Sequence, residues 1–390
     1  MTRPRKNCRC SFLSLLLAAL LFNCSLPLTL RAQETASPPP PAPLRRMRRK
    51  KGELPKAPAI RRAPPGNQAS SADDDEVVRV DTELANILLT AVDKDQRFIT
   101  TLKREDVRVL EDGAPQELSI FERETDLPLT LSVLIDTSRS QEKILPDEKR
   151  AARTFIDSVV RPDKDQASVI SFTGEAVLQE PLTNDLSLLR SAVERVLIEL
   201  PADSPECGEN ASSEREPRCY TGVWDALWVT TNEVLSQTPE RARRAIILLS
   251  DGDDTSSTTK RQEAIDLAVK NNVVIYSIGI HDEGSEGKLA DDALTKVSEK
   301  TGGRAFFPLD KQSLEAAFAQ IQSELRSQYL IAYQPSNRKH DGSFRQVRVE
   351  IINRELRKQK LRLLYRQGYY AAISPSAISA PAPLQENRPK

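Results

Sequence analysis

The sequence has little of what most catalytic sites require. Its 390 residues include only two histidines and five cysteines, and none of them has the spacing of a zinc site. No Gly-x-Ser-x-Gly turn and no glycine-rich phosphate loop precedes a helical pattern. An aspartyl phosphatase would need a second aspartate two residues after Asp136, where Ser138 stands. We therefore expect a protein that is not an enzyme, and a hydrolase with Asp136 as nucleophile is the weakest alternative.

An excess of charge of either sign is also missing. The chain has 56 Lys and Arg and 56 Asp and Glu, for a formal net charge of zero, so no overall field favours a nucleic-acid partner. Basic residues are concentrated locally in "RRMRRKK" (45–51), within a segment rich in Pro, Ala, Arg and Ser (33–75). Such a composition predicts a disordered linker. Its basic run could make weak contact with anionic envelope polymers.

Long apolar runs are scarce, and the longest lies near the N-terminus. A basic stretch precedes "FLSLLLAALLF" (12–22), an arrangement typical of a secretory signal peptide. We predict a signal peptide over residues 1–32 with cleavage after Ala32, so the protein would be exported to the periplasm, the cell envelope or the extracellular space. An uncleaved anchor and a lipoprotein modified at Cys24 stay open as alternatives.

Cysteine is scarce, and signal removal would leave only two. Cys207 and Cys219 flank a polar segment before "YTGVWDAL". In an exported chain, such a pair predicts a disulfide. Two free thiols are the alternative.

Two segments with alternating apolar and polar residues flank the middle of the chain. The N-terminal one (76–127) contains "VRVLEDGAPQELSIFE", which predicts a β-hairpin about "DGAP". The C-terminal one (327–372) contains three strand-like runs, "YLIAYQP", "FRQVRVEIIN" and "KLRLLYRQGYY". We expect both segments to join in one small β sheet. Residues 373–390 have the composition of a disordered tail.

Between these segments, residues 128–326 alternate strand and helix patterns. "LTLSVLID" (129–136) is an apolar run that predicts a strand buried on both faces, and "RRAIILLSDG" repeats its design. Amphipathic helical patterns separate such strands. The alternation predicts an α/β fold with a doubly wound, mostly parallel sheet, accompanied by the small flanking β unit.

Polar oxygens follow both of these strands. Asp136 and Asp251 end them, and ligands of open parallel sheets gather at that edge. Ser138 and Ser140 follow Asp136 at alternate positions and are expected to face the same way. A set of carboxylates and hydroxyls suits Mg²⁺ or another hard divalent cation such as Mn²⁺. Helix capping by the same residue types is the alternative.

Taken with Thr221 in "YTGVWDAL", these residues resemble the metal-ion-dependent adhesion site of von Willebrand factor type A domains. That pattern is Asp-x-Ser-x-Ser, a distant Thr and a distant Asp, and it falls on Asp136, Ser138, Ser140, Thr221 and Asp251. The flanking β segments resemble a bacterial exported subgroup typical of Acidobacteria. The commoner "DTSGSM" of that subgroup is replaced by "DTSRSQ" here.

The resemblance implies how the site would act. The three hydroxyls would hold the cation, the two aspartates would act directly or through water, and an open position would take an Asp or Glu carboxylate of a partner protein. The sequence thus predicts an exported, non-enzymatic protein-binding or adhesion module. A structural cell-envelope protein with a metal-stabilised scaffold is the main alternative.

Overall fold

The computed structural model describes residues 44–49, 84–123, 127–199, 221–239, 242–280 and 288–373. All of them belong to one compact unit, Pro41–Lys390. The predicted signal peptide, most of the predicted linker and tail, and the Cys207–Cys219 pair lie outside the described residues. Among the helices that are described, none has both the length and the apolar character needed to cross a bilayer.

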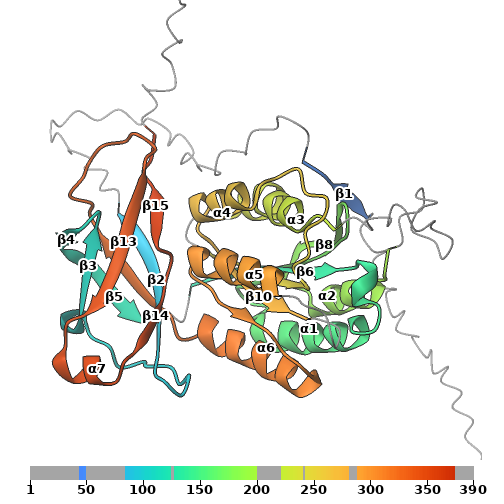
Figure 1. Cartoon of the computed structure of the whole chain (residues 1–390), viewed down its shortest axis with the longest axis horizontal. Coiled ribbons are helices and arrows are strands. Elements are labelled where there is room, and N and C mark those ends of the chain that lie inside the picture. Colours follow the sequence, from blue (N-terminus) through green and yellow to red (C-terminus); the bar gives the residue numbers. More distant parts are fainter. Residues whose placement is uncertain are drawn as a thin grey trace, which may run out of the picture. The chain divides into compact units, whose positions relative to one another are not determined.

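A seven-stranded sheet forms the centre of the α/β domain, in the order β1-β8-β7-β6-β9-β10-β11 (Figure 1). Strands β7, β6, β9, β10 and β11 run parallel, and β8 and β1 continue the sheet in antiparallel fashion. This confirms the predicted mostly parallel α/β fold. The strands are β1 (Arg45–Met47), β6 (Leu129–Asp136), β7 (Gln166–Phe172), β8 (Ala176–Thr183), β9 (Arg243–Ser250), β10 (Val273–Gly279) and β11 (Ala305–Phe306).

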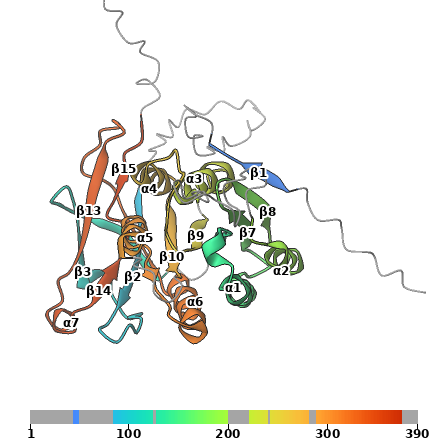
Figure 2. The ribbon, with the colours of Figure 1, turned by 45° about the vertical axis from the view of Figure 1, so that its right-hand side comes forward.

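Helices cover both faces of this sheet (Figure 2). The central strand β6 is buried along its whole length: Leu131 and Val133 face the side of α1, α2 and α6, whereas Leu134 faces the side of α3, α4 and α5. Burial on both faces explains why β6 is mostly apolar. The helices are α1 (Leu145–Val159), α2 (Leu186–Arg195), α3 (Val223–Val229), α4 (Arg261–Lys270), α5 (Lys288–Thr301) and α6 (Lys311–Leu325), and a π-helical segment, η4 (Thr230–Leu235), extends α3.

The flanking segments form two four-stranded antiparallel sheets rather than the single sheet expected from the sequence. Each strand has one apolar face, so two facing sheets bury what one sheet would expose; Ile87, Tyr333 and Val347 share the resulting core. One sheet is β14 (Arg362–Leu364), β2 (Ala85–Val92), β12 (Tyr329–Tyr333) and β5 (Leu118–Arg123). The other is β15 (Gly368–Tyr370), β13 (Phe344–Ile351), β3 (Val107–Glu111) and β4 (Ala114–Gln116), with the short helices η1 (Arg104–Asp106) and α7 (Arg354–Lys358) beside them.

The predicted hairpin is confirmed as β3–β4. Asp112 and Gly113 both have positive φ, 48° and 85°, as the tightest hairpin turns require. The run "QELSIFE" then leaves this sheet, and β5 pairs with β12 in the other one. The two sheets are therefore linked by the chain immediately after the hairpin.

Strand β1 departs from the expected linker. It pairs with the edge strand β8, whose backbone groups would otherwise be open to pairing. Met47 is buried in the core, the Arg49 guanidinium lies 4.7 Å from the centre of the Trp228 ring, and Arg45 pairs with Glu233 at 2.8 Å. Part of the basic run is thus tied to acidic and aromatic groups of the domain itself.

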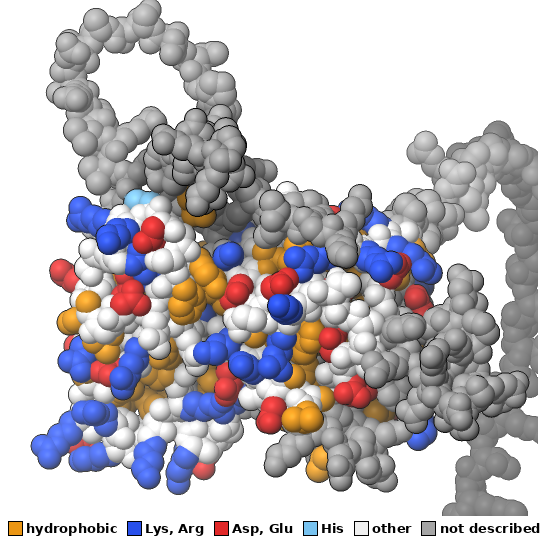
Figure 3. All heavy atoms as spheres, turned by 45° about the horizontal axis from the view of Figure 1, so that its top comes forward, with side chains coloured by type: hydrophobic (Ala, Val, Ile, Leu, Met, Phe, Trp, Pro, Cys, Tyr) orange, Lys and Arg blue, Asp and Glu red, His pale blue; other side chains and the backbone are white. Residues whose placement is uncertain are grey.

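The β sandwich and the α/β domain are joined near the start of the parallel strands. Arg362 pairs with Glu299 at 2.9 Å, and Lys300 donates to Gln367 at 2.7 Å. On the face drawn in Figure 3, basic and acidic side chains are interspersed.

Candidate metal centre

The site lies where the order of the strands reverses. From β6 the chain passes through α1 to β7 on one side, and it later places β9 on the other side. Because β6 and β9 run parallel, their carboxyl ends meet at one edge. A reversal of this kind leaves a crevice that ligands of α/β proteins use. It brings Asp136, at the end of β6, and Asp251, directly after β9, to the same place.

Asp136 is the innermost group of the site. Its side chain is fully buried. One carboxylate oxygen accepts a hydrogen bond from the Ser138 N–H at 2.9 Å, and the other accepts from the Ser250 hydroxyl at 2.6 Å. Burial, followed by the charge of Asp251, raises the pKa of Asp136 to about 7. A buried carboxyl that repels a second one favours a cation between them.

The two serines connect Asp136 to Asp251. Ser138 Oγ lies 3.0 Å from Ser140 Oγ, and Ser140 Oγ donates to Asp251 Oδ2 at 2.5 Å. Ser138 is buried, whereas Ser140 is exposed. The oxygens therefore form a row from the interior to the surface, and a ligand from solution can reach the outer end of the row at Ser140.

A glycine shapes the loop that carries Asp251. Gly252 has φ of +81°, and a Cβ at this position would lie 2.9 Å from Leu294 Cγ. Its N–H donates to Ser250 Oγ at 3.0 Å. The Asp253 N–H donates to Asp251 Oδ1 at 3.1 Å. These two hydrogen bonds of the turn hold Asp251, which is half-buried, at the outer end of the site.

Thr221 is joined to the same loop through its backbone. Its N–H donates to Thr255 Oγ1 at 2.8 Å, and its carbonyl oxygen accepts from the N–H groups of Thr255 and Ser256 at 2.9 and 3.1 Å. The structure thus joins four of the five predicted ligands by side-chain hydrogen bonds and places Thr221 beside them on the neighbouring loop. Their role as metal ligands stays a prediction.

Three further residues belong to the site and were not found from the sequence. Ser250 orients Asp136, as described above. Gln141 Nε2 donates to Asp251 Oδ2 at 3.0 Å. Glu148 lies on the buried face of α1, and its burial, followed by the charges of Asp136 and Asp251, raises its pKa. The available signals were a serine that ends the apolar strand "AIILLS" and a glutamate on the apolar face of "LPDEKRAARTF".

The site fits a hydrated hard cation. Its donors are carboxylate, hydroxyl and amide oxygens, the ligands that Mg²⁺ and Mn²⁺ accept. Among the residues that the structure describes, the buried oxygens Gln141 Oε1, Glu148 Oε1 and Glu148 Oε2 have no hydrogen-bond partner, so they can accept from bound water. Across the described part of the chain, no three His, Cys, Asp or Glu side chains form a direct metal-ligand cluster. A cation here would depend on hydroxyls and water as well as on carboxylates.

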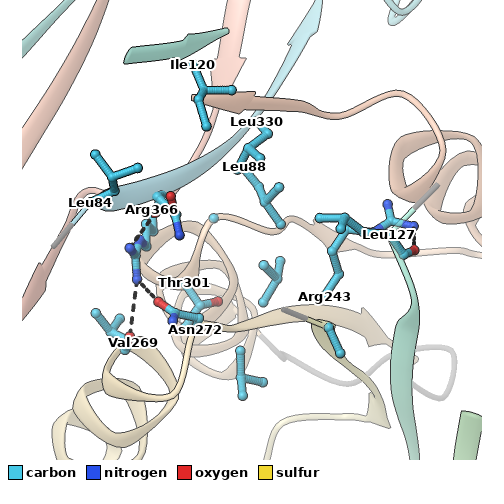
Figure 4. A pocket seen from close by; sticks show the side chains of 15 residues that line it. Leu84, Leu88, Ile120, Leu127, Arg243, Val269, Asn272, Thr301, Leu330 and Arg366 are labelled. Atoms are coloured by element: carbon cyan, nitrogen blue, oxygen red, sulfur yellow. Dashed lines mark hydrogen bonds between the residues drawn. The ribbon is translucent and has the colours of Figure 1, made fainter. Parts of the chain in front are cut away.

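A cavity of about 430 Å³ lies at the opposite edge, near the start of β9 and β10 (Figure 4). Apolar side chains of both domains line most of it, including Leu88 and Leu330 of the β sandwich. The Arg366 side chain donates to Asn272 Oδ1 and to the carbonyl oxygens of Val269 and Asn86. These bonds join the two domains, and we interpret the cavity as part of their junction.

A family model for the von Willebrand factor type A domain matches residues 212–320, which include Thr221 and Asp251. A search of curated proteins found no match.

Solved structures with a similar fold include proximal thread matrix protein 1 from the mussel byssus (17% identity, 55% of this chain and 51% of that chain, TM-score 0.42). A further structure of that mussel protein has a zinc-occupied MIDAS motif (18% identity, 54% and 48%, TM-score 0.41). A von Willebrand factor type A protein from Catenulispora acidiphila is also similar (12% identity, 77% and 76%, TM-score 0.42). The present chain spans about half the length of the mussel protein. Residues 212–320 are therefore similar to the von Willebrand factor type A domain.

Proposed function

We propose that this chain is an exported, non-enzymatic protein-binding module that holds a divalent cation, Mg²⁺ or Mn²⁺, at Asp136, Ser138, Ser140, Thr221 and Asp251. The observation that carries the proposal is the hydrogen-bonded set of two carboxylates and two hydroxyls at the carboxyl ends of β6 and β9. Export and the Cys207–Cys219 disulfide are inferred from the sequence alone.

The charge of the donor set indicates the kind of partner. Two carboxylates balance a divalent cation, and the hydroxyls are neutral, so a bound cation remains an electrophile for a further oxygen ligand. The exposed Ser140 leaves that side of the site open to solvent. An Asp or Glu side chain of a partner protein has the matching charge and oxygen chemistry.

The surroundings of Asp136 favour binding over hydrolysis. A nucleophilic carboxylate must reach its substrate. Asp136 is fully buried, and both of its oxygens already accept hydrogen bonds, from Ser138 and Ser250. This arrangement suits a group that positions a cation and its water.

Cation-dependent capture of a partner tests the proposal. The immobilised full chain is exposed to envelope extract in Mg²⁺ or in EDTA, alongside the variants Asp251→Ala and Asp253→Ala. Asp253 is an exposed carboxylate of the same loop, so its removal is a matched control. We expect capture in Mg²⁺ that is lost in EDTA and in Asp251→Ala and kept in Asp253→Ala.

Two other outcomes count against the proposal. Capture that is equal in EDTA and in Asp251→Ala would show that the partner does not use the cation. If EDTA lowers the unfolding temperature while no partner is captured in Mg²⁺, the metal-stabilised scaffold becomes the better explanation.

A further inference from the structure

Glu148 is a buried carboxyl group whose oxygens accept no hydrogen bond from the described residues. Its side chain is fully buried in the first turn of α1. Neither carboxylate oxygen has a hydrogen-bond partner in the described part of the chain. A carboxylate that is buried without a partner strongly destabilises a protein. The presence of Glu148 at this position therefore suggests that it interacts with a bound ligand.

Glu148 lies on the side of α1 that faces the candidate metal centre. It lies on the buried face of α1 with Leu145, Ala152 and Phe155, the spacing that places side chains on one side of a helix. This face packs on the sheet at β6, and α1 begins shortly after the short 3₁₀ helix Arg139–Gln141, which follows Ser138 and contains Ser140. Burial, and then the charges of Asp136 and Asp251, raise the pKa of Glu148. Its place in the first turn of α1, shortly after Ser138 and Ser140, puts Glu148 on the α1 side of the site.

Gln141 adds a second unpartnered acceptor. Its Nε2 donates to Asp251 Oδ2 at 3.0 Å and, at 3.3 Å, to Ser140 Oγ. An ionised carboxylate can only accept, so the amide nitrogen must face Asp251. The buried Oε1 is then directed away from Asp251 and has no hydrogen-bond partner within the described ranges. The site therefore has three orphan acceptor oxygens, on two residues, in addition to its predicted ligands.

Water bound to a cation would satisfy these acceptors. Mg²⁺ keeps several of its waters when it binds to proteins, and buried water is found where polar groups lack other partners. Glu148 does not form a direct three-carboxylate cluster with Asp136 and Asp251 among the described residues. A contact through water would explain both why the Glu148 oxygens lack a partner among the described residues and why no direct cluster is formed.

We propose that Glu148 is a positioning residue of the metal centre, which accepts hydrogen bonds from cation-bound water on the α1 side, with Gln141 Oε1 as a second acceptor. This inference rests on the proposed function, because it requires a cation at the site. A bound cation favours the ionised form of Glu148, which then adds a third negative charge and strengthens retention of the cation. The same charge weakens the attraction that an acidic partner experiences, so Glu148 sets the balance between the two affinities.

Calorimetric titration of the full chain with Mg²⁺ and with Mn²⁺ tests the inference, using Glu148→Gln and the control Glu142→Gln. The glutamine is nearly isosteric, and Glu142 is an exposed carboxylate next to Gln141. Loss of an outer-sphere partner typically weakens metal binding by about 10-fold or more, and we expect this for Glu148→Gln. Exposed charges are screened, so Glu142→Gln should bind both ions about as tightly as the wild type.

A second readout separates positioning of water from a structural role. Water-proton relaxation by bound Mn²⁺ reports the number and exchange of metal-bound waters, and it should change in Glu148→Gln and not in Glu142→Gln. In EDTA, Glu148→Gln should be about as stable as the wild type, because burial raises the pKa of Glu148 and the glutamine then replaces a carboxyl that is held toward its neutral form.

The outcomes distinguish this inference from the proposed function. Unchanged ion affinity and unchanged relaxation in Glu148→Gln, with binding lost in Asp251→Ala, would overturn the inference and leave the proposed function standing. A wild-type chain that binds neither ion would overturn both.

Discussion

At the scale of single residues, the site is organised by depth. Asp136 is inside and receives its hydrogen bonds from Ser138 and Ser250, whereas Ser140 and Asp251 lie toward the solvent. The Ser250 hydroxyl makes two hydrogen bonds: it donates to Asp136, and its oxygen accepts from the Gly252 N–H. One small side chain therefore couples the inner carboxylate to the loop that carries the outer one.

The stability of the metal-free protein should fall as the pH rises from about 4 to about 7. The folded pKa of Asp136 is raised to about 7, above its unfolded value, so the stability contributed by the protonated carboxyl is present at low pH. That stability is lost as the pH passes through the folded pKa. Each unit of pKa difference corresponds to about 1.4 kcal/mol, and a total loss of about 2–4 kcal/mol is expected.

Urea unfolding in EDTA across this pH range measures the effect, with Asp136→Asn as the comparison. The variant should lose clearly less stability, because only Glu148 remains as a strongly shifted acid at the site. Equal slopes for the two proteins would contradict the assignment to Asp136.

At the scale of elements, two neighbouring parallel strands build the site. β6 ends in Asp136 and β9 ends in Ser250. The loop after β9 is held by the start of α3, where the Asp225 carboxylate accepts from the N–H groups of Thr258 and Thr259 at 2.9 and 2.8 Å. The position of the outer carboxylate is therefore set by tertiary contacts of its loop.

Gly252→Ala should destabilise the protein and weaken cation binding together. The residue has φ of +81°, and its Cβ would meet the Leu294 side chain. Backbone strain of this kind costs about 1–3 kcal/mol, and relief by movement of the loop would displace Asp251. Thermal unfolding with and without Mg²⁺ measures both effects. Gly113→Ala, which also has positive φ but open space around the Cβ, is the control: it should lose stability and keep its affinity for Mg²⁺.

The elements also show how far the sequence could be interpreted. The apolar strand "LTLSVLID", the hairpin at Asp112–Gly113 and the alternation of strands and helices all followed from local pattern. Pairing between distant segments did not. Strand β1 pairs with β8 through only three residue pairs, which is too short for a period to be recognised, and the division of the flanking strands into two sheets depends on how their faces meet. At the site, Glu148 was missed because a single acid on a helix is usually a solvated surface group.

At the scale of the whole described unit, the two edges of the central sheet have different surroundings. The carboxyl ends of β6 and β9 present the candidate metal centre, while the β sandwich is attached near the opposite ends through Arg366 and Arg362. A buried ion pair of Arg304 and Glu324, at 3.0 Å, holds α6 at the same junction, where Arg304 also donates to Gln96 of the sandwich. Among the described residues, these contacts of the sandwich lie away from the edge with the candidate metal centre.

The most direct test of the central claim is a crystal of the full chain grown with Mn²⁺ and measured for anomalous scattering. We predict one strong anomalous peak among Asp136, Ser138, Ser140, Thr221 and Asp251, with water density between the peak and Glu148. The peak should be absent from crystals of Asp251→Ala grown in the same solution. No peak at this edge of the sheet in the wild type, or a peak that persists in Asp251→Ala, would contradict the account.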